Sequence, residues 1–286
     1  MTSRIIDFHT HIFPDRIAER ALGKLSAASH TRVFADGTAA GLRASMTRAG
    51  VDLSVVLPVA TAAGQTAHIN ERAAETHRRA AETGIDSFGA AHPDDPDWER
   101  ELKKLKDAGV KGIKIHPPYQ GVDLDDPRYL RILEKAGELG LTVVTHAGLD
   151  VGLPGAEQAA PDKILRAVKA AGPVRLVCAH MGGWKRWDEV RRLLADTEVY
   201  LDTSFCLEPM APNGDGYPWR EEELRRLDEE AFRDMARLFG AERILFGTDS
   251  PWEDQAEEVK RIRRLDLTEA EKEAVLGGNA ERLLAE

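Results

Sequence analysis

The chain has 286 residues, of which 42% are hydrophobic and 31% charged, the balance of an ordinary soluble globular protein with a sizeable core. Its 39 basic and 49 acidic side chains give a formal net charge of −10, which disfavours nonspecific binding to nucleic acid or to anionic membranes. The sequence shows no secretory signal pattern and no apolar stretch of the roughly 18 residues that a spanning helix needs, so we expect a cytoplasmic protein. Two cysteines, Cys178 and Cys206, are too few for a disulfide framework.

Short β-branched or apolar runs alternate with longer amphipathic, charge-rich segments along the whole chain. This alternation is typical of strand–helix units around a parallel sheet. The predicted strands lie near residues 4–8, 53–57, 87–91, 110–115, 141–145, 174–179, 198–203 and 243–248. Eight strands that are each followed by a helix predict a (β/α)8 TIM barrel of the α/β class.

Helices are expected where apolar positions recur at helical spacing with charges between them. Such segments include 66–83, 95–108, 127–139, 161–171, 187–196 and 228–239, and two C-terminal helices follow at about 252–265 and 268–285. Gly277 and Gly278 mark a predicted break before the last helix. The segment 205–220, rich in proline and glycine, is expected to be a surface loop on the rim of the barrel. No linker divides the chain, so residues 1–286 are predicted to form one domain.

The first predicted strand ends in two histidines, His9 and His11, that are one residue apart. Side chains at positions i and i+2 of a strand lie on the same face, so the two imidazoles should project together where the strand ends. Two imidazoles held in this way can bind one metal ion. A pair of this kind is more often two surface histidines, so a metal site requires further ligands downstream.

Three other predicted strands also end in residues of the metal-binding types. His146 and His180 follow the runs 141–145 and 174–179, and Asp249 follows the run 243–248. One histidine at a strand end is more often a hydrogen-bonded core residue than a ligand. Four histidines and an aspartate on one rim of a barrel instead favour a catalytic metal centre, although spacing alone does not say which histidines touch the ion.

Six motifs surround these residues and extend the pattern over nearly the whole chain. They are Asp7-Phe8-His9-Thr10-His11, Gly112-Ile113-Lys114-Ile115-His116-Pro117, Thr145-His146-Ala147-Gly148, Ala179-His180-Met181-Gly182-Gly183, Phe246-Gly247-Thr248-Asp249-Ser250-Pro251 and Gly278-Asn279-Ala280-Glu281-Arg282-Leu283-Leu284. With these motifs the chain resembles the amidohydrolase superfamily, and in particular its amidohydrolase-2 branch, which includes aminocarboxymuconate-semialdehyde decarboxylase-like enzymes.

The resemblance implies a distorted (β/α)8 barrel with one divalent metal as cofactor, with zinc favoured and manganese as the alternative. It also implies that His9, His11, His146 and Asp249 are the metal ligands. By the same resemblance His180 is a nearby catalytic imidazole rather than a ligand.

Lys114 has more than one interpretation. In binuclear relatives a lysine on the fourth strand is a carboxylated bridge between two metals, whereas the Lys-x-His-Pro motif of this branch commonly occurs in enzymes with one metal, so we expect one. The alternative for Lys114 is an ion pair with a carboxylate such as Asp249. His116 and His92, each before a proline, are candidates for substrate or second-metal contacts or for shaping loops. Trp184 is a candidate pocket wall or a plain buried indole.

Two enzymatic hypotheses use this set of residues. A metal with an open coordination position makes hydroxide available from bound water at neutral pH, while Asp249 can take or relay a proton and His180 can polarise a substrate oxygen or act as an acid. The leading hypothesis is therefore hydrolysis of an ester, lactone or amide bond in a small, anionic molecule. The second, raised by the resemblance, is metal-dependent, non-oxidative decarboxylation of an aromatic or unsaturated carboxylic acid.

A third hypothesis is a catalytically inactive barrel that only binds a small molecule. In every case the expected partner is a small-molecule substrate, with no nucleic acid and no membrane. Self-association into a homo-oligomer is left open.

Overall fold

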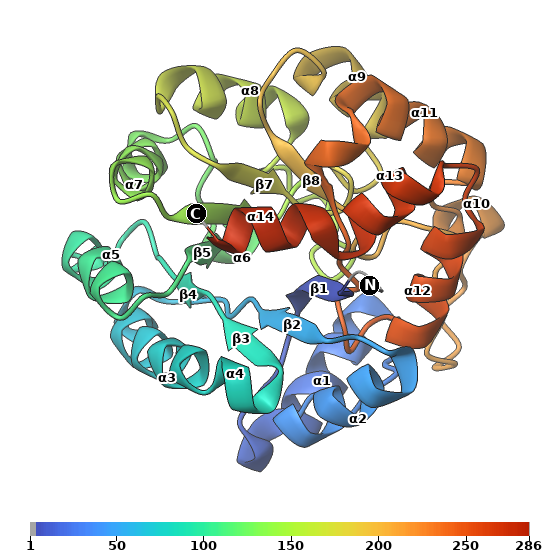
Figure 1. Cartoon of the computed structure of the whole chain (residues 1–286), viewed down its shortest axis with the longest axis horizontal. Helices are drawn as coiled ribbons and strands as arrows, with labels where there is room; N and C mark the ends of the chain where they lie inside the picture. The colour runs from blue at the N-terminus through green and yellow to red at the C-terminus, as the bar shows by residue number, and fades with distance from the viewer. Residues whose placement is uncertain (1–3, 286) are drawn as a thin grey trace.

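A computed structural model describes residues 4–285, and its strands follow one another around a barrel (Figure 1). The strands are β1 (Ile6–Thr10), β2 (Leu53–Val56), β3 (Ile85–Ser87), β4 (Gly89–Ala90), β5 (Gly112–Ile115), β6 (Thr142–Thr145), β7 (Leu176–Cys178), β8 (Tyr200–Asp202) and β9 (Ile244–Leu245). All neighbouring strands are parallel, in the orders β1-β2-β3 and β4-β5-β6-β7-β8-β9. The predicted (β/α)8 TIM barrel is confirmed.

The third predicted strand, 87–91, is interrupted at Phe88, so that β3 and β4 belong to different sheets. The Phe88 N–H still donates to the Val56 carbonyl oxygen at 3.0 Å, which keeps the interruption beside β2. The Phe88 ring packs edge-on against Phe8 with ring centroids 5.4 Å apart. The barrel is therefore distorted at this strand, as the resemblance implied.

The first and last strands meet and close the barrel. The Phe8 N–H donates to the Phe246 carbonyl oxygen at 2.8 Å, and the Asp249 N–H donates to the His9 carbonyl oxygen at 2.8 Å. The His11 N–H donates to the Ser250 carbonyl oxygen at 2.7 Å. Because these bonds join the ends of β1 and β9, they bring His9, His11 and Asp249 to one place on the rim.

Helices cover the outside of the barrel (Figure 1). They are α1 (Asp15–Ser29), α2 (Ala39–Ala49), α3 (Thr66–Arg78), α4 (Ala80–Thr83), α5 (Trp98–Asp107), α6 (Pro117–Gln120), α7 (Pro127–Glu138), α8 (Pro161–Ala170), α9 (Trp187–Leu194), α10 (Glu221–Leu224), α11 (Glu229–Phe239), α12 (Gln255–Arg264), α13 (Glu269–Glu273) and α14 (Asn279–Ala285). The sequence pattern did not specify α1 and α2, and the expected helix 66–83 occurs as α3 and α4. The segment 205–220 is irregular, as predicted.

The C-terminal helix α14 crosses one end of the barrel (Figure 1), where Ala280 and Leu283 join the apolar side chains of the barrel interior. The predicted break at Gly277 and Gly278 is wrong, because a π-helical turn, Ala274–Gly278, leads from α13 into α14. A Cβ atom on Gly277 would lie 1.9 Å from the carbonyl oxygen of Arg4. Glycine is therefore needed here because this turn packs directly against the backbone just before β1.

Residues 1–3 and 286 of the predicted domain 1–286 lie outside the described residues. Within residues 4–285, none of the helices combines the length and the apolar character that crossing a lipid bilayer requires.

Candidate metal centre

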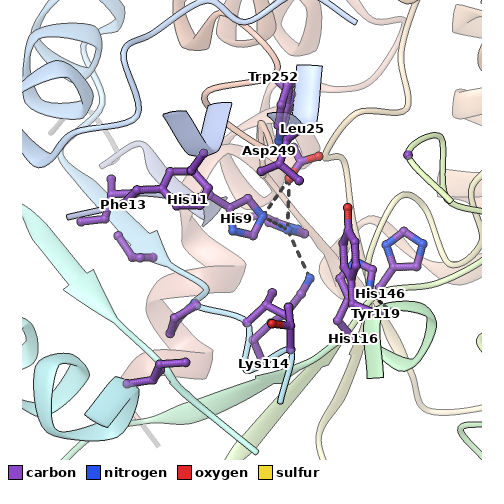
Figure 2. Close-up of a pocket in the computed structure, with 18 of the residues that line it drawn as sticks. His9, His11, Phe13, Leu25, Lys114, His116, Tyr119, His146, Asp249 and Trp252 are labelled. Atoms are coloured by element: carbon purple, nitrogen blue, oxygen red, sulfur yellow. Dashed lines mark hydrogen bonds and ion pairs between the residues drawn. The ribbon is translucent and has the colours of Figure 1, made fainter. Parts of the chain in front are cut away.

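Three of the predicted ligands, His9, His11 and Asp249, meet where the barrel closes (Figure 2). Nε2 of His9 lies 3.2 Å from Nε2 of His11 and 3.4 Å from Oδ1 of Asp249, and Nε2 of His11 lies 3.0 Å from the same oxygen. Donors that bind zinc tetrahedrally at 2.0–2.2 Å stand roughly 3.3–3.6 Å apart. The three donor atoms therefore fit a single divalent ion, and we call these residues the triad.

A carboxylate on strand β8 orients His9. Oδ2 of Asp202, the last residue of β8, lies 2.8 Å from Nδ1 of His9, and both side chains are buried. This contact holds the His9 proton on Nδ1 and leaves Nε2 free to bind a metal. Asp202 was not among the site residues predicted from the sequence, although an acid at the end of the predicted strand 198–203 was a usable signal.

The fourth expected ligand, His146, lies in a second buried group with His116 and Asp150 (Figure 2 labels both histidines). Oδ2 of Asp150 lies 3.5 Å from Nε2 of His116 and 3.9 Å from Nε2 of His146, and the two imidazole rings stack with centroids 4.3 Å apart. Burial raises the pKa of Asp150. Asp150 was also missed, and the role of His146 as a metal ligand stays a prediction.

His180 follows β7 and lies beside His146. Its Nε2 is 3.2 Å from Nδ1 of His146, and its Nδ1 is 2.9 Å from the carbonyl oxygen of Ser204. Burial, and then the neighbouring His146, lower the pKa of His180 to about 4, so the ring is neutral at pH 7. A neutral ring here donates from Nδ1 to Ser204 and keeps Nε2 as an acceptor.

Lys114 of β5 is almost fully buried, and its Nζ lies 3.3 Å from Nε2 of His9 (Figure 2). Burial lowers the pKa of Lys114 to about 8, against the opposing attraction of Asp202 and Asp249. No ion pair between Lys114 and Asp249 forms among the described residues. The amine instead contacts the triad through His9.

His92 and Trp184, the two remaining candidates, differ in whether they line the cavity described below. Nδ1 of His92 accepts a hydrogen bond from the Asp94 N–H at 3.1 Å, and His92 is not part of the cavity lining within residues 4–285. This contact shapes the turn before α5. Trp184 does line the cavity, next to Phe205 at 6.2 Å between ring centroids. Its buried indole N–H has no partner among the described residues.

The triad and the second group both line one cavity of about 1090 Å³. This volume is slightly above the usual range of about 300–1,000 Å³ for pockets that hold small molecules. Five aromatic side chains contribute to its wall, namely Phe13, Tyr119, Trp184, Phe205 and Trp252. The cavity can therefore hold a planar organic molecule in contact with the triad.

A parallel (β/α)8 barrel whose rim carries histidines and an aspartate defines a metal-dependent enzyme of the amidohydrolase type, and the amidohydrolase family model matches residues 6–285. The chain belongs to this family. It is 28% identical over 203 residues to 2-amino-3-carboxymuconate-6-semialdehyde decarboxylase of Dictyostelium discoideum, a match that covers 63% of this chain and 55% of that protein. The chain thus spans little more than half the length of this curated relative.

Solved structures share the whole fold. A 5-carboxyvanillate decarboxylase from Sphingomonas paucimobilis has a TM-score of 0.66 at 19% identity, with 99% of both chains covered. A 5-carboxyvanillate decarboxylase from Novosphingobium aromaticivorans with bound manganese has a TM-score of 0.70 at 16% identity, with 99% of this chain and 97% of that one covered. An uncharacterised TIM-barrel protein from Bordetella bronchiseptica reaches 0.71 at 18% identity, with 99% and 98% covered.

These relatives overturn the leading hypothesis of ester, lactone or amide hydrolysis, because the curated relative and both neighbours named for a reaction are decarboxylases. They favour the second hypothesis instead. A divalent metal is supported by the family match, by the manganese in the Novosphingobium neighbour and by the donor geometry of the triad.

Proposed function

We propose that the protein is a metal-dependent, non-oxidative decarboxylase of an aromatic or unsaturated carboxylic acid. The observation that carries the proposal is the triad of His9, His11 and Asp249 at the wall of a large cavity with an aromatic lining. The decarboxylases among the similar proteins support the same reaction.

The proposed cofactor is one divalent ion held by His9, His11 and Asp249, with His146 as the predicted fourth ligand. Zinc is favoured because two or three imidazoles with one carboxylate suit it, and manganese is the alternative. Such an ion, when bound, supplies positive charge that stabilises negative charge developing on substrate oxygens.

In the proposed reaction the bond between the substrate carbon and its carboxylate breaks, and the electron pair stays on the carbon. Carbon dioxide leaves and a proton takes its place, so no oxidant is needed. Asp249 is proposed to carry this proton. Burial raises the pKa of Asp249, but the hydrogen bond from His11 and the nearby His9 and His180 outweigh burial and lower it. Asp249 is therefore ionised at rest, and we propose that it takes a proton from solvent water before it delivers one to the carbon.

His180 is proposed to orient the substrate. Its Nδ1 is held by the Ser204 carbonyl oxygen at 2.9 Å, so Nε2 is the nitrogen available to accept a hydrogen bond from a substrate hydroxyl or acid group. Trp184 and the other aromatic side chains line the same cavity and are proposed to limit the access of water to the reacting face.

The test is to incubate the metal-loaded protein with a panel of aromatic and unsaturated carboxylic acids and to follow product masses and released carbon dioxide. We expect at least one acid to lose carbon dioxide, and we expect Asp249→Asn to abolish this activity. Asp188→Asn, at a side chain that is 98% exposed, is the matched control and should keep it. Products that gain water, or activity that persists in Asp249→Asn, would contradict the proposal.

A further inference from the structure

Side chains of both charges line the cavity. The metal end carries the carboxylates of Asp150 and Asp249, whereas the helices α1 and α3 bring the guanidinium groups of Arg16 and Arg72 to the wall of the same cavity. His68, one helical turn before Arg72 on α3, also lines it. The acidic chain thus presents positively charged side chains on the wall of this cavity.

Neither arginine has a partner in the part of the chain that the structure describes. Arg16 and Arg72 are exposed and form no hydrogen bond or ion pair with any of residues 4–285. Arg166 shows the contrast, because it binds both Asp125 and Asp162. The side chain of Asp15 also lines the cavity, yet it forms no ion pair with Arg16. The two guanidinium groups therefore keep their full capacity to donate to an anion.

The surface that accompanies the two arginines is apolar. Ile17, Ala21 and Leu25 follow Arg16 along α1 at intervals of one helical turn, and all three line the cavity. Ile69 precedes Arg72 on α3 and lines it as well. Apolar side chains of the same two helices therefore line the cavity together with the two arginines.

We propose that Arg16 and Arg72 bind a second anionic group of the substrate, distinct from the carboxylate that is lost at the metal end. The inference rests on the proposed function and narrows its substrate class to acids with two negative charges separated by an apolar body. Guanidinium groups suit this task because they bind carboxylates through paired, charge-assisted hydrogen bonds. The arginines also offset the repulsion that a net charge of −10 exerts on a doubly charged anion.

The volume of the cavity supports the same proposal. A cavity of about 1090 Å³ is several times larger than a single-ring acid needs, which leaves room for a longer molecule that reaches from the triad to α1 and α3. The alternative is that both arginines are ordinary solvated surface charges, in which case they add nothing to the binding of an acid.

The test compares rigid acids that differ only in the distal charge. The probes are naphthalene-2-carboxylate against naphthalene-2,6-dicarboxylate, and biphenyl-4-carboxylate against biphenyl-4,4′-dicarboxylate. Their binding to the metal-loaded protein is measured by calorimetry at low ionic strength. We expect one dicarboxylate to bind at least about tenfold more tightly than its matched monocarboxylate, the size expected of charge-assisted hydrogen bonds.

The preference should fall several-fold in Arg16→Gln and in Arg72→Gln and vanish in the double variant. Arg20→Gln is the matched control, because Arg20 is exposed one turn further along α1 and does not line the cavity. Equal binding within both probe pairs, or a preference that survives in the double variant, would overturn the inference. Because binding is measured without turnover, a failure of decarboxylation would refute the proposed function and leave the binding result to decide the inference.

Discussion

His146 and His180 face each other through ring nitrogens that carry no proton when both rings are neutral. Nδ1 of His146 lies 3.2 Å from Nε2 of His180, while the other nitrogen of each ring faces a carbonyl oxygen, that of Leu149 at 3.0 Å and that of Ser204 at 2.9 Å. A carbonyl oxygen only accepts, so each neutral ring directs its N–H towards it. Two lone pairs then oppose each other, so neither of these two nitrogens donates a hydrogen bond to the other while both rings are neutral.

The metal-free protein should lose stability as the pH falls below about 6.5. Burial lowers the pKa of His146 and of His180 from 6.5 to about 4. Between these values the unfolded chain binds more protons than the folded one, so the free energy of unfolding falls with the pH. The stability that the two neutral histidines contribute is complete above pH 6.5 and is lost progressively as the pH falls to about 4. Each histidine contributes on the order of 3 kcal/mol at most.

Urea unfolding of the metal-free protein at several pH values between 7 and 4 measures this effect. The double variant His146→Asn, His180→Asn should show a clearly shallower dependence over the same range. An unchanged slope would mean that other groups cause the acid sensitivity.

His146→Ala and His180→Ala should differ in metal content. If His146 is the fourth ligand, its loss weakens metal retention, whereas loss of His180 leaves the ion bound and lowers turnover by about 10²–10⁴-fold. Elemental analysis after dialysis against a weak chelator, together with turnover, separates the two. Coordinate loss of metal in His180→Ala would make His180 a ligand, and full metal in His146→Ala would remove His146 from the ligand set.

Asp202→Asn should weaken metal binding without removing any ligand. The Asp202 carboxylate lies 2.8 Å from Nδ1 of His9. Hydrogen bonds to the ring nitrogen that does not bind the metal typically contribute 10–100-fold to metal affinity. Competition with a chromogenic chelator gives the affinity. Asp188→Asn, which changes an exposed side chain, should bind metal as the wild type does. Wild-type affinity in Asp202→Asn would show that the His9 ring is held in place by its packing alone.

Gly277→Ala should destabilise the fold by more than about 2 kcal/mol, because forcing a group into a filled site costs roughly 1–3 kcal/mol and here the obstacle is backbone. The new Cβ would lie 1.9 Å from the Arg4 carbonyl oxygen. Gly278→Ala is the matched control, since its Cβ would lie an ordinary 3.6 Å from the Glu273 carbonyl oxygen. Denaturant unfolding of both variants checks the difference. Equal stability would mean that the turn can move away from Arg4.

The order of strands and helices in the barrel could be predicted from the sequence because the two kinds of element have different hydrophobic periods. The convergence of His9 and His11 followed from their spacing on one strand, and that of Asp249 from its place at a strand end. The interruption at Phe88 was not predicted, although Gly89 within the run 87–91 was a usable signal, since a glycine inside a strand often marks an irregularity. Helix α1 carried a usable signal in Ile17, Ala21 and Leu25, which recur at helical spacing.

The second group was harder to foresee. Asp150 lies in the loop after β6, where an aspartate is usually a solvated turn residue, and only its approach to His116 at 3.5 Å gives it a place in the site. Likewise the resemblance placed His146 with the triad, but a motif does not fix the side-chain torsions that turn its Nε2 towards Leu149.

The closure of the barrel by β1 and β9 determines when the metal can bind during folding. Asp7 and Thr248, which are hydrogen-bonded beside the triad, are 241 residues apart in the chain. Contacts this distant form late, because a very long loop must close first. A growing or partly refolded chain therefore has no complete site. The time course of metal binding should therefore report the final step of folding. An ion bound by His9, His11 and Asp249 would also link the first and last strands of the barrel.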